Sequence, residues 1–198
     1  LDGHGFLLHL DRVCPAIDGA VTVLSNSGSP PARQRNPTTR IPAMARASKP
    51  TITLPMIRKH LYSAVVSDAL DALGYKKQSP RLSLTPFTGS SLLVGRCKTT
   101  LWVDMFHVDP QPYALELQAV DECRPDDVLI AAAGGSVRSG IWGELLTTAA
   151  KNRGCVGAIV DGAIRDVSKI RPMDFPVYAR TTCVYDSLNR QRVVDLDV

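Results

Sequence analysis

The chain has 198 residues, of which 44% are hydrophobic and 21% charged, and its formal net charge is +4. This length and composition predict one globular domain with a hydrophobic core. Residues 19–67 hold seven Lys and Arg and no acidic residue, so the positive charge of this segment exceeds the net charge of the whole chain. The charge therefore belongs to one segment and does not indicate a nucleic-acid partner. No apolar run approaches the roughly 20 residues of a membrane span, so no membrane segment is expected.

The cysteine and histidine residues exclude two further classes of protein. The five cysteines are odd in number and form no C-x-x-C pair, which argues against a disulfide framework or a zinc site. The four histidines are scattered along the chain, which argues against a histidine-built metal centre. We therefore expect reduced thiols and a cytoplasmic protein.

Residues 1–50 differ in composition from the rest of the chain. The segment 25–49 is rich in Ser, Pro, Arg and Thr and has no regular apolar period, so it cannot bury enough surface to offset its ordering entropy. An organelle transit peptide and translated upstream sequence, with the true start at Met44 or Met56, are both open interpretations of this region. We predict a disordered or non-native tail over 1–50 and a catalytic domain over 51–198.

After residue 50 the sequence shows regular secondary-structure patterns. Thr53 can cap a helix whose first turn contains Pro55, where the missing N–H costs nothing. Apolar residues recur at helical spacing as far as Leu73, and Gly74 follows at the position typical of a helix C-cap, so one continuous helix is predicted. A run of β-branched and aromatic residues predicts a long strand over 92–105.

The rest of the chain alternates between helical and strand patterns. The elements predicted, in chain order, are a helix over 112–120, a turn at 125–127, a strand over 128–133, a helix over 139–153, a strand over 156–160, a turn at 161–162, a short helix after 166, and strands over 175–180 and 192–198. This alternation implies parallel strands joined by right-handed crossovers, and hence the α/β class. Sites in such sheets lie beyond the carboxyl ends of the strands, where Gly134-Gly135 and the segment 161–166 fall.

Three residues near these strand ends could form one pocket. Glu144 lies on the predicted helix, and Arg165 and Asp166 follow the next strand, so a βαβ unit would place them side by side. The planar fork of arginine matches the two oxygens of a carboxylate, and one aspartate with waters can hold Mg²⁺. Backbone N–H groups at Leu145 and Leu146 would add donors near the helix N-terminus. Together these groups can bind a 2-oxo acid to a metal ion, whereas an Arg-Asp pair without this context is more often a solvated surface pair.

The spacing of these residues and several short sequence motifs nearby form one pattern. Glu144 is followed by twenty residues and then by Arg165-Asp166. The accompanying motifs are Ser67-Asp68-Ala69-Leu70, Gly134-Gly135, Trp142-Gly143-Glu144-Leu145-Leu146 and Asp174-Phe175-Pro176-Val177. Over about 130 residues the chain resembles the RraA-like family, whose hallmark is an acidic residue, twenty residues and Arg-Asp. The resemblance implies an RraA-like βαβ core, with a mixed parallel sheet or barrel and flanking helices.

The resemblance also implies an activity and residue roles. Characterised members are 4-hydroxy-4-methyl-2-oxoglutarate aldolases with oxaloacetate decarboxylase activity, and both reactions release pyruvate. By resemblance, Asp166 would ligate Mg²⁺ or Mn²⁺ directly and Glu144 would hold the ion through a water molecule. Arg165 would bind the pyruvyl group of a small 2-oxo acid, aided by Gly143 and the backbone N–H groups of Leu145 and Leu146. The family further implies a homotrimer or hexamer with the site between subunits.

The chain departs from the family pattern at three places. Glu144 stands where the aldolases often have Asp, and Lys169 stands where members commonly carry an acidic residue. We also expect family strands beyond Val198, including one that carries an acidic group to the metal site of the neighbouring subunit.

A second hypothesis from the same resemblance is a non-catalytic regulator. One member of the family inhibits a ribonuclease by protein contact, and loss of the acidic residue at position 144 would favour that role. The presence of Glu144 favours the enzyme. The chain lacks G-x-G-x-x-G and a P-loop Lys, which argues against NAD, ATP or a methyl donor as ligands.

Overall fold

The computed structural model describes residues 52–89 and 92–198, and the predicted tail at 1–50 lies outside them. The described strands are β1 (Thr85–Thr88), β2 (Arg96–Asp104), β3 (Asp127–Ala132), β4 (Gly140–Trp142), β5 (Gly157–Ile164), β6 (Val177–Thr182) and β7 (Gln191–Leu196). The helices are α1 (Leu54–His60), α2 (Ser63–Ala72), α3 (Ala114–Asp121), α4 (Glu144–Asn152) and α5 (Val167–Ile170), followed by the 3-10 turn η2 (Arg171–Met173). No helix within these ranges is long and apolar enough to cross a membrane.

The strands form one mixed sheet in the order β1-β6-β5-β3-β2-β7, with β4 paired to β5. The central strands β2, β3, β5 and β6 are parallel, and β1 and β7 pair antiparallel at the two edges. Helices connect the parallel strands, because βαβ crossovers need a dozen or more residues to return the chain to the same end of the sheet. The predicted α/β class and mixed sheet are confirmed; over residues 52–89 and 92–198 the sheet is open rather than a closed barrel.

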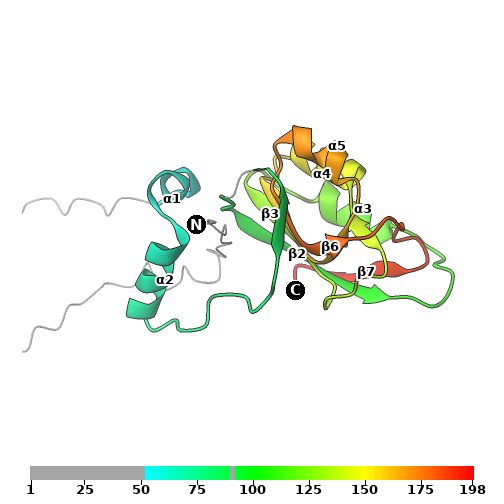
Figure 1. Ribbon diagram of the computed structural model, residues 1–198, viewed down its shortest axis with the longest axis horizontal. Helices are drawn as coiled ribbons and strands as arrows, with labels where there is room; N and C mark the ends of the chain where they lie inside the picture. Colours follow the sequence, from blue (N-terminus) through cyan, green and yellow to red (C-terminus); the bar gives the residue numbers. More distant parts are fainter. Residues whose placement is uncertain (1–51, 90–91) are drawn as a thin grey trace, which may run out of the picture.

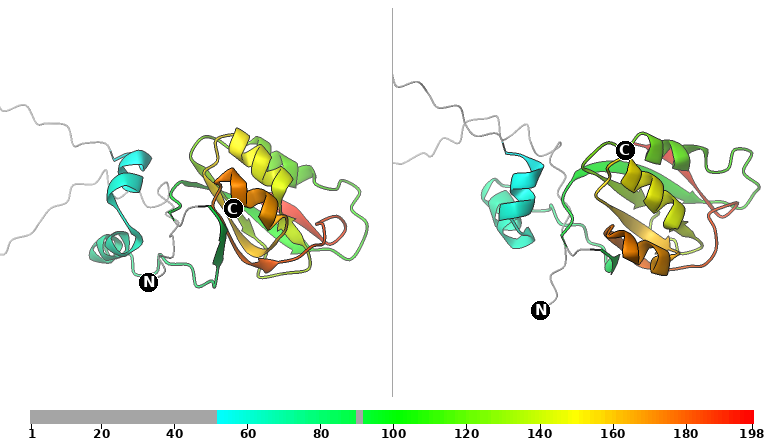
Figure 2. Two further views of the ribbon diagram at one scale, coloured as in Figure 1. Left: turned by 45° about the horizontal axis from the view of Figure 1, so that its top comes forward. Right: turned by 90° about the horizontal axis from the view of Figure 1, so that it is seen from above.

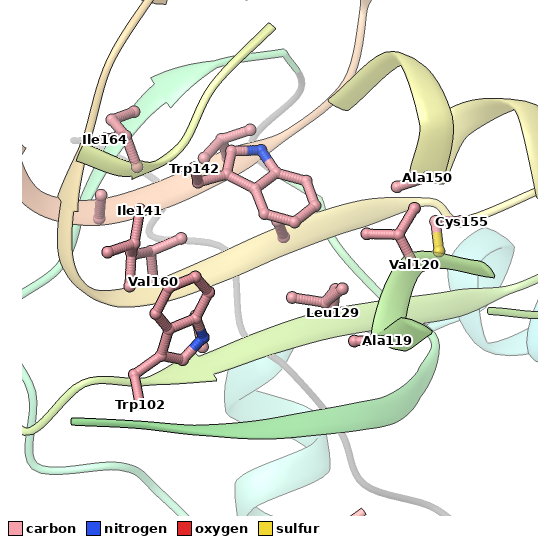
Figure 3. Packing of buried hydrophobic residues seen from close by; sticks show 14 of the residues in the cluster. Trp102, Ala119, Val120, Leu129, Ile141, Trp142, Ala150, Cys155, Val160 and Ile164 are labelled. Atoms are coloured by element: carbon pink, nitrogen blue, oxygen red, sulfur yellow. The ribbon is translucent and has the colours of Figure 1, made fainter. Parts of the chain in front are cut away.

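The core lies between the sheet and three helices. Helices α3, α4 and α5 lie side by side on one face of the sheet, and α1 and α2 lie apart from them (Figures 1 and 2). Beneath these helices, buried Trp102 and Trp142 pack with Leu129 and Val160 from the central strands (Figure 3). The ring of Trp142 stacks on Phe175 with the centroids 6.4 Å apart. Burial of these large side chains holds the strand ends that carry the site at fixed positions.

The single helix predicted from Thr53 to Leu73 is wrong, because the chain forms α1 and α2 with an extended break at Leu61 and Tyr62. The start is as predicted, with the Thr53 hydroxyl accepting from the Met56 N–H. At about 100° per residue, a straight helix would place Ile57 and Val66 on opposite faces. The break lets both side chains enter one small core, which also contains Leu70 and Val94.

The helix predicted over 139–153 is also wrong at its start. Gly140–Trp142 forms β4, which pairs with β5, and α4 begins only at Glu144. Glycine is required here by close packing: a Cβ on Gly140 would lie 2.9 Å from the Arg165 Cβ, and one on Gly143 would lie 2.6 Å from the Asp166 Oδ2. The buried side chains of Ile141 and Trp142 then suit a strand in the core.

Strand β5 is longer than predicted. It continues to Ile164, so the predicted turn at Asp161-Gly162 is wrong, and the residues lie at a register shift inside the strand. A Cβ on Gly162 would approach the Ser136 carbonyl oxygen to 2.9 Å, and the Asp161 carboxylate pairs with Arg180. The apolar and β-branched pattern of the sequence did not predict β1, and it placed the start of β2 four residues too early. The extension of β5 carries Arg165 and Asp166 directly to the strand end.

Candidate active site

The carboxyl ends of β4, β5 and β6 meet at one edge of the sheet. Glu144 lies two residues after the end of β4, Arg165 and Asp166 follow β5, and the segment 183–190 follows β6. The Glu144 N–H donates to the Asp166 Oδ2 at 3.2 Å, and the Arg165 Nε lies 3.7 Å from the same oxygen. The structure therefore brings together Glu144, Arg165 and Asp166, as the βαβ spacing predicted.

Asp166 occupies a strained position at the start of α5. Its φ is +57°, in the left-handed region that non-glycine residues seldom adopt, and its backbone carbonyl accepts from Lys169 and Ile170. This conformation turns the carboxylate toward α4, where it lies against the bare backbone of Gly143. The side chain remains 39% exposed, so solvent or an ion can reach it. Such strain is typical of functional sites.

The first turn of α4 supplies backbone donors beside Asp166. The N-cap residue Gly143 has no side chain to cap the helix, the Asp166 carboxylate accepts from the Glu144 N–H, and the Gly143 carbonyl accepts from the Thr147 N–H and hydroxyl. The N–H groups of Leu145 and Leu146 belong to the first turn, where intrahelical acceptors are lacking. Leu145 is 78% exposed, which leaves this end of α4 accessible. These donors lie where the sequence placed them.

Gly134-Gly135 does not belong to this helix N-terminus. The pair precedes β4 rather than α4, the Gly135 N–H donates to the Asp161 carbonyl, and a Cβ on Gly135 would lie 3.2 Å from the Arg180 guanidinium carbon. The Gly pair, which the sequence placed at the end of a strand, is therefore separated from α4 by β4.

Arg165 has a partner that the sequence prediction missed. Its Nη2 lies 2.6 Å from the Oδ2 of Asp186, in the segment after β6. The other oxygen of Asp186 accepts from the Tyr113 hydroxyl at 2.7 Å and from the Leu188 N–H at 2.7 Å. The only available signal was the position of Asp186 beyond the carboxyl end of a predicted parallel strand.

The site contains groups with shifted pKa values. Burial raises the pKa of Glu116 to about 7, although a hydrogen bond from the Ser187 hydroxyl lowers it. Burial and the hydrogen bond to Asp186 raise the pKa of Tyr113 to about 12. Burial also opposes ionisation of Asp186, but the hydrogen bonds from Tyr113 and Leu188 and the charge of Arg165 lower its pKa below the ordinary value. Near neutral pH, Asp186 is thus an anion facing Arg165.

The residues present fit a hard divalent cation that keeps most of its water. Among the described residues, no three His, Cys, Asp or Glu side chains gather in metal-binding geometry. Mg²⁺ is usually held by one or two carboxylates together with several waters. The exposed carboxylate of Asp166 is one donor of that kind, and the backbone of Glu144 lies beside it.

Two arginines close in sequence to Asp186 are engaged in contacts away from Arg165. The Arg190 guanidinium donates to the carbonyls of Asp186 and Leu188 and lies over the Tyr185 ring, and Arg192 pairs with buried Asp109 at 3.1 Å. Both side chains stabilise the segment around β7.

Comparisons with known proteins agree with the geometry. Residues 63–198 match the RraA-like family, described as Aldolase/RraA. Protein DlpA of Legionella pneumophila is 30% identical over 146 residues, and a Halalkalibacterium halodurans protein named "Putative 4-hydroxy-4-methyl-2-oxoglutarate aldolase" is 30% identical over 119 residues. The matches cover 71% and 60% of this chain, but only 23% and 52% of those two relatives.

Solved structures show the same fold. Streptomyces coelicolor RraAS2, described as an unusual member of the RNase ES inhibitor RraA protein family, is 25% identical with a TM-score of 0.60, over 73% of this chain and 70% of that one. A Geobacillus kaustophilus protein described as S-adenosylmethionine: 2-dimethylmenaquinone methyltransferase is 28% identical with a TM-score of 0.55, over 67% of this chain and 78% of that one. From its fold, its site residues and the match over 63–198, the chain belongs to the RraA-like family.

Proposed function

We propose that the protein is a metal-dependent carbon–carbon lyase that releases pyruvate from 4-hydroxy-2-oxo acids of the 4-hydroxy-4-methyl-2-oxoglutarate type and decarboxylates oxaloacetate. The observation that carries the proposal is the convergence of the Arg165 guanidinium, the exposed Asp166 carboxylate and the first turn of α4, whose Glu144 N–H donates to Asp166. The name printed for the Halalkalibacterium halodurans relative, "Putative 4-hydroxy-4-methyl-2-oxoglutarate aldolase", adds support.

Each group has a definite role in this proposal. Asp166 would hold Mg²⁺ or Mn²⁺ directly and Glu144 would hold it through a water molecule. When bound, the cation polarises the 2-oxo group of the substrate. Arg165 pairs with the substrate carboxylate, and the N–H groups of Leu145 and Leu146 donate to the same end of the molecule.

The residues then act on the bond that breaks. The bond that breaks joins the pyruvyl group to C4 of the hydroxy acid, or to the carboxylate carbon that leaves as CO₂. Its electron pair moves toward the pyruvyl group. The fixed positive charge of Arg165 and the dipoles of the α4 N–H groups stabilise the negative charge that develops there. In the aldol cleavage the 4-hydroxyl proton passes to water as C4 becomes the carbonyl carbon of the second product. In both reactions a proton from water then completes the methyl group of pyruvate. We further propose that the protein acts in the cytoplasm as a homotrimer or hexamer, with the site between subunits.

The test measures pyruvate formed from oxaloacetate by the full chain with Mg²⁺ or Mn²⁺, with and without a chelator. Turnover should stop on chelation and should be lost in Asp166→Ala, whereas Glu144→Asp should retain it because the contact runs through water. Turnover that survives chelation contradicts the metal mechanism. An Asp166→Ala enzyme within about tenfold of wild type, or about 1.4 kcal/mol in the barrier, contradicts the ligand role.

Arg165→Lys separates the enzyme from a regulator that binds a ribonuclease. Lysine keeps the charge but lacks the two-pronged geometry, so pyruvate release should fall by orders of magnitude while folding is unchanged. The same two proteins are assayed for ribonuclease inhibition. Metal-loaded, folded wild type that releases no pyruvate but inhibits a ribonuclease would establish the regulator instead.

A further inference from the structure

The guanidinium of Arg165 is held along one edge by carboxylates of its own chain. Asp186 lies 2.6 Å from Nη2, and Asp166 lies 3.7 Å from Nε. The Nε–Nη2 edge therefore faces these two residues, and the N–H groups of Nη1 point away from them. An arginine held on one edge by a carboxylate keeps N–H donors on its other edge for a ligand.

Asp186 is itself held by a group from another part of the chain and by a backbone N–H of its own segment. Its Oδ1 accepts from the Tyr113 hydroxyl and from the Leu188 N–H, both at 2.7 Å. Tyr113 stands immediately before α3 with a φ of +65°, a strained backbone that directs the ring toward the segment after β6. The chain of contacts Tyr113–Asp186–Arg165 thus joins the start of α3 to the end of β5.

The exposure of these side chains separates this ion pair from an ordinary surface pair. Arg165 and Asp186 are each 32% exposed, whereas the surface pair Arg153–Asp121 is 50% and 69% exposed at a similar 2.8 Å. Each Asp186 oxygen has a partner, so the carboxylate cannot rotate without losing hydrogen bonds. A half-buried pair whose carboxylate has a partner on each oxygen holds the arginine in place and can preorganise a ligand site.

We propose that Asp186, anchored by the Tyr113 hydroxyl, is a positioning residue that fixes the Arg165 guanidinium so that its free N–H groups grip the carboxylate of the 2-oxo acid. The role rests on the proposed function for the identity of the ligand. The competing role for Asp186 is a blocking carboxylate that occupies Arg165 in place of substrate. The two roles predict opposite changes in affinity when the Asp186 charge is removed.

The experiment compares wild type with Asp186→Asn, Asp186→Glu and Tyr113→Phe. Asp121→Asn is the matched control, because it removes the same charge from an Arg–Asp pair outside the site. One readout is the NMR signal of the Arg165 Nε–H in arginine-labelled protein, identified by its absence in Arg165→Lys. The other is pyruvate affinity in the presence of Mn²⁺, measured by calorimetry alongside kcat and KM for oxaloacetate.

In Asp186→Asn we expect the Arg165 Nε–H to exchange with water at least about tenfold faster and pyruvate to bind about tenfold more weakly, or about 1.4 kcal/mol. Tyr113→Phe should give a smaller change in the same direction, Asp186→Glu should recover part of the affinity, and Asp121→Asn should match wild type. KM should rise more than kcat falls, because Asp186 orients a binding group.

Two outcomes overturn the positioning role. One is an Arg165 Nε–H signal that is unchanged in Asp186→Asn; the other is tighter pyruvate binding in that variant, which would make Asp186 a blocking residue. If wild type neither binds pyruvate nor turns over oxaloacetate, the proposed function fails. The Nε–H exchange still decides whether Asp186 fixes Arg165, so the two failures are distinguishable.

Discussion

Glu116 is a carboxyl group that the fold buries beside Asp186 and Ser187. Burial raises its pKa from 4.5 to about 7; the nearby charge of Asp186 acts in the same direction, while the Ser187 hydroxyl and Arg165 oppose it. The folded protein therefore binds this proton more tightly than the unfolded chain does. The resulting stabilisation is complete below about pH 4.5 and is lost as the pH rises through 7.

The free energy of unfolding should consequently fall between pH 5 and pH 8, with at most about 3 kcal/mol of the fall due to Glu116. Urea unfolding of wild type and Glu116→Gln across this range checks the prediction, and the variant should show a flatter profile. Glu122→Gln is the control, because the hydrogen bond from Lys98 lowers the pKa of Glu122. A profile that is equally steep in Glu116→Gln would show that another group is responsible.

Arg58 joins helix α1 to the residues that precede β2 and β3, in addition to the packing of Ile57 in the small core with Val94. Its guanidinium donates to the Val94 carbonyl at 2.8 Å and 3.1 Å and lies 2.6 Å from the Asp126 carboxylate. Arg58→Ala removes these hydrogen bonds and leaves a part-buried carbonyl unpaired, so we expect a loss of about 1–2 kcal/mol of stability.

Urea unfolding and limited proteolysis between α2 and β2 test this attachment. The neighbouring Lys59→Ala removes a charge from an exposed position of the same helix and serves as the control. Faster cleavage in Arg58→Ala alone supports the attachment, whereas equal behaviour of the two variants contradicts it.

Element types were easier to predict than element boundaries. Strand and helix patterns located β2, α3, β3, β5 and β6, because their apolar periods are local properties of the chain. The start of α4 and the break between α1 and α2 were not predicted, because both depend on contacts between residues that are far apart in the sequence. Gly140 and Gly143 are required by Arg165 and Asp166, which lie on a different element. Helix propensity gives no information on such contacts.

At the scale of the whole molecule, removal of residues 1–50 should leave the melting temperature and oxaloacetate turnover unchanged. The reason is compositional: this segment has no apolar period that could form a packed element. Calorimetry and the pyruvate assay on the shortened protein and the full chain test the prediction. A large drop in melting temperature would show that the segment packs on the domain.

The sequence by itself determined the α/β class and the pairing of Glu144 with Arg165-Asp166, because one βαβ unit encodes both and its spacing is visible along the chain. Only the tertiary structure decided that Arg165 faces Asp186, that Tyr113 holds Asp186, and that Glu116 is buried beside them. These residues come from three separate connections of the sheet. Strand order and helix packing decide which connections meet, and those arise from burial of the whole core rather than from any local pattern.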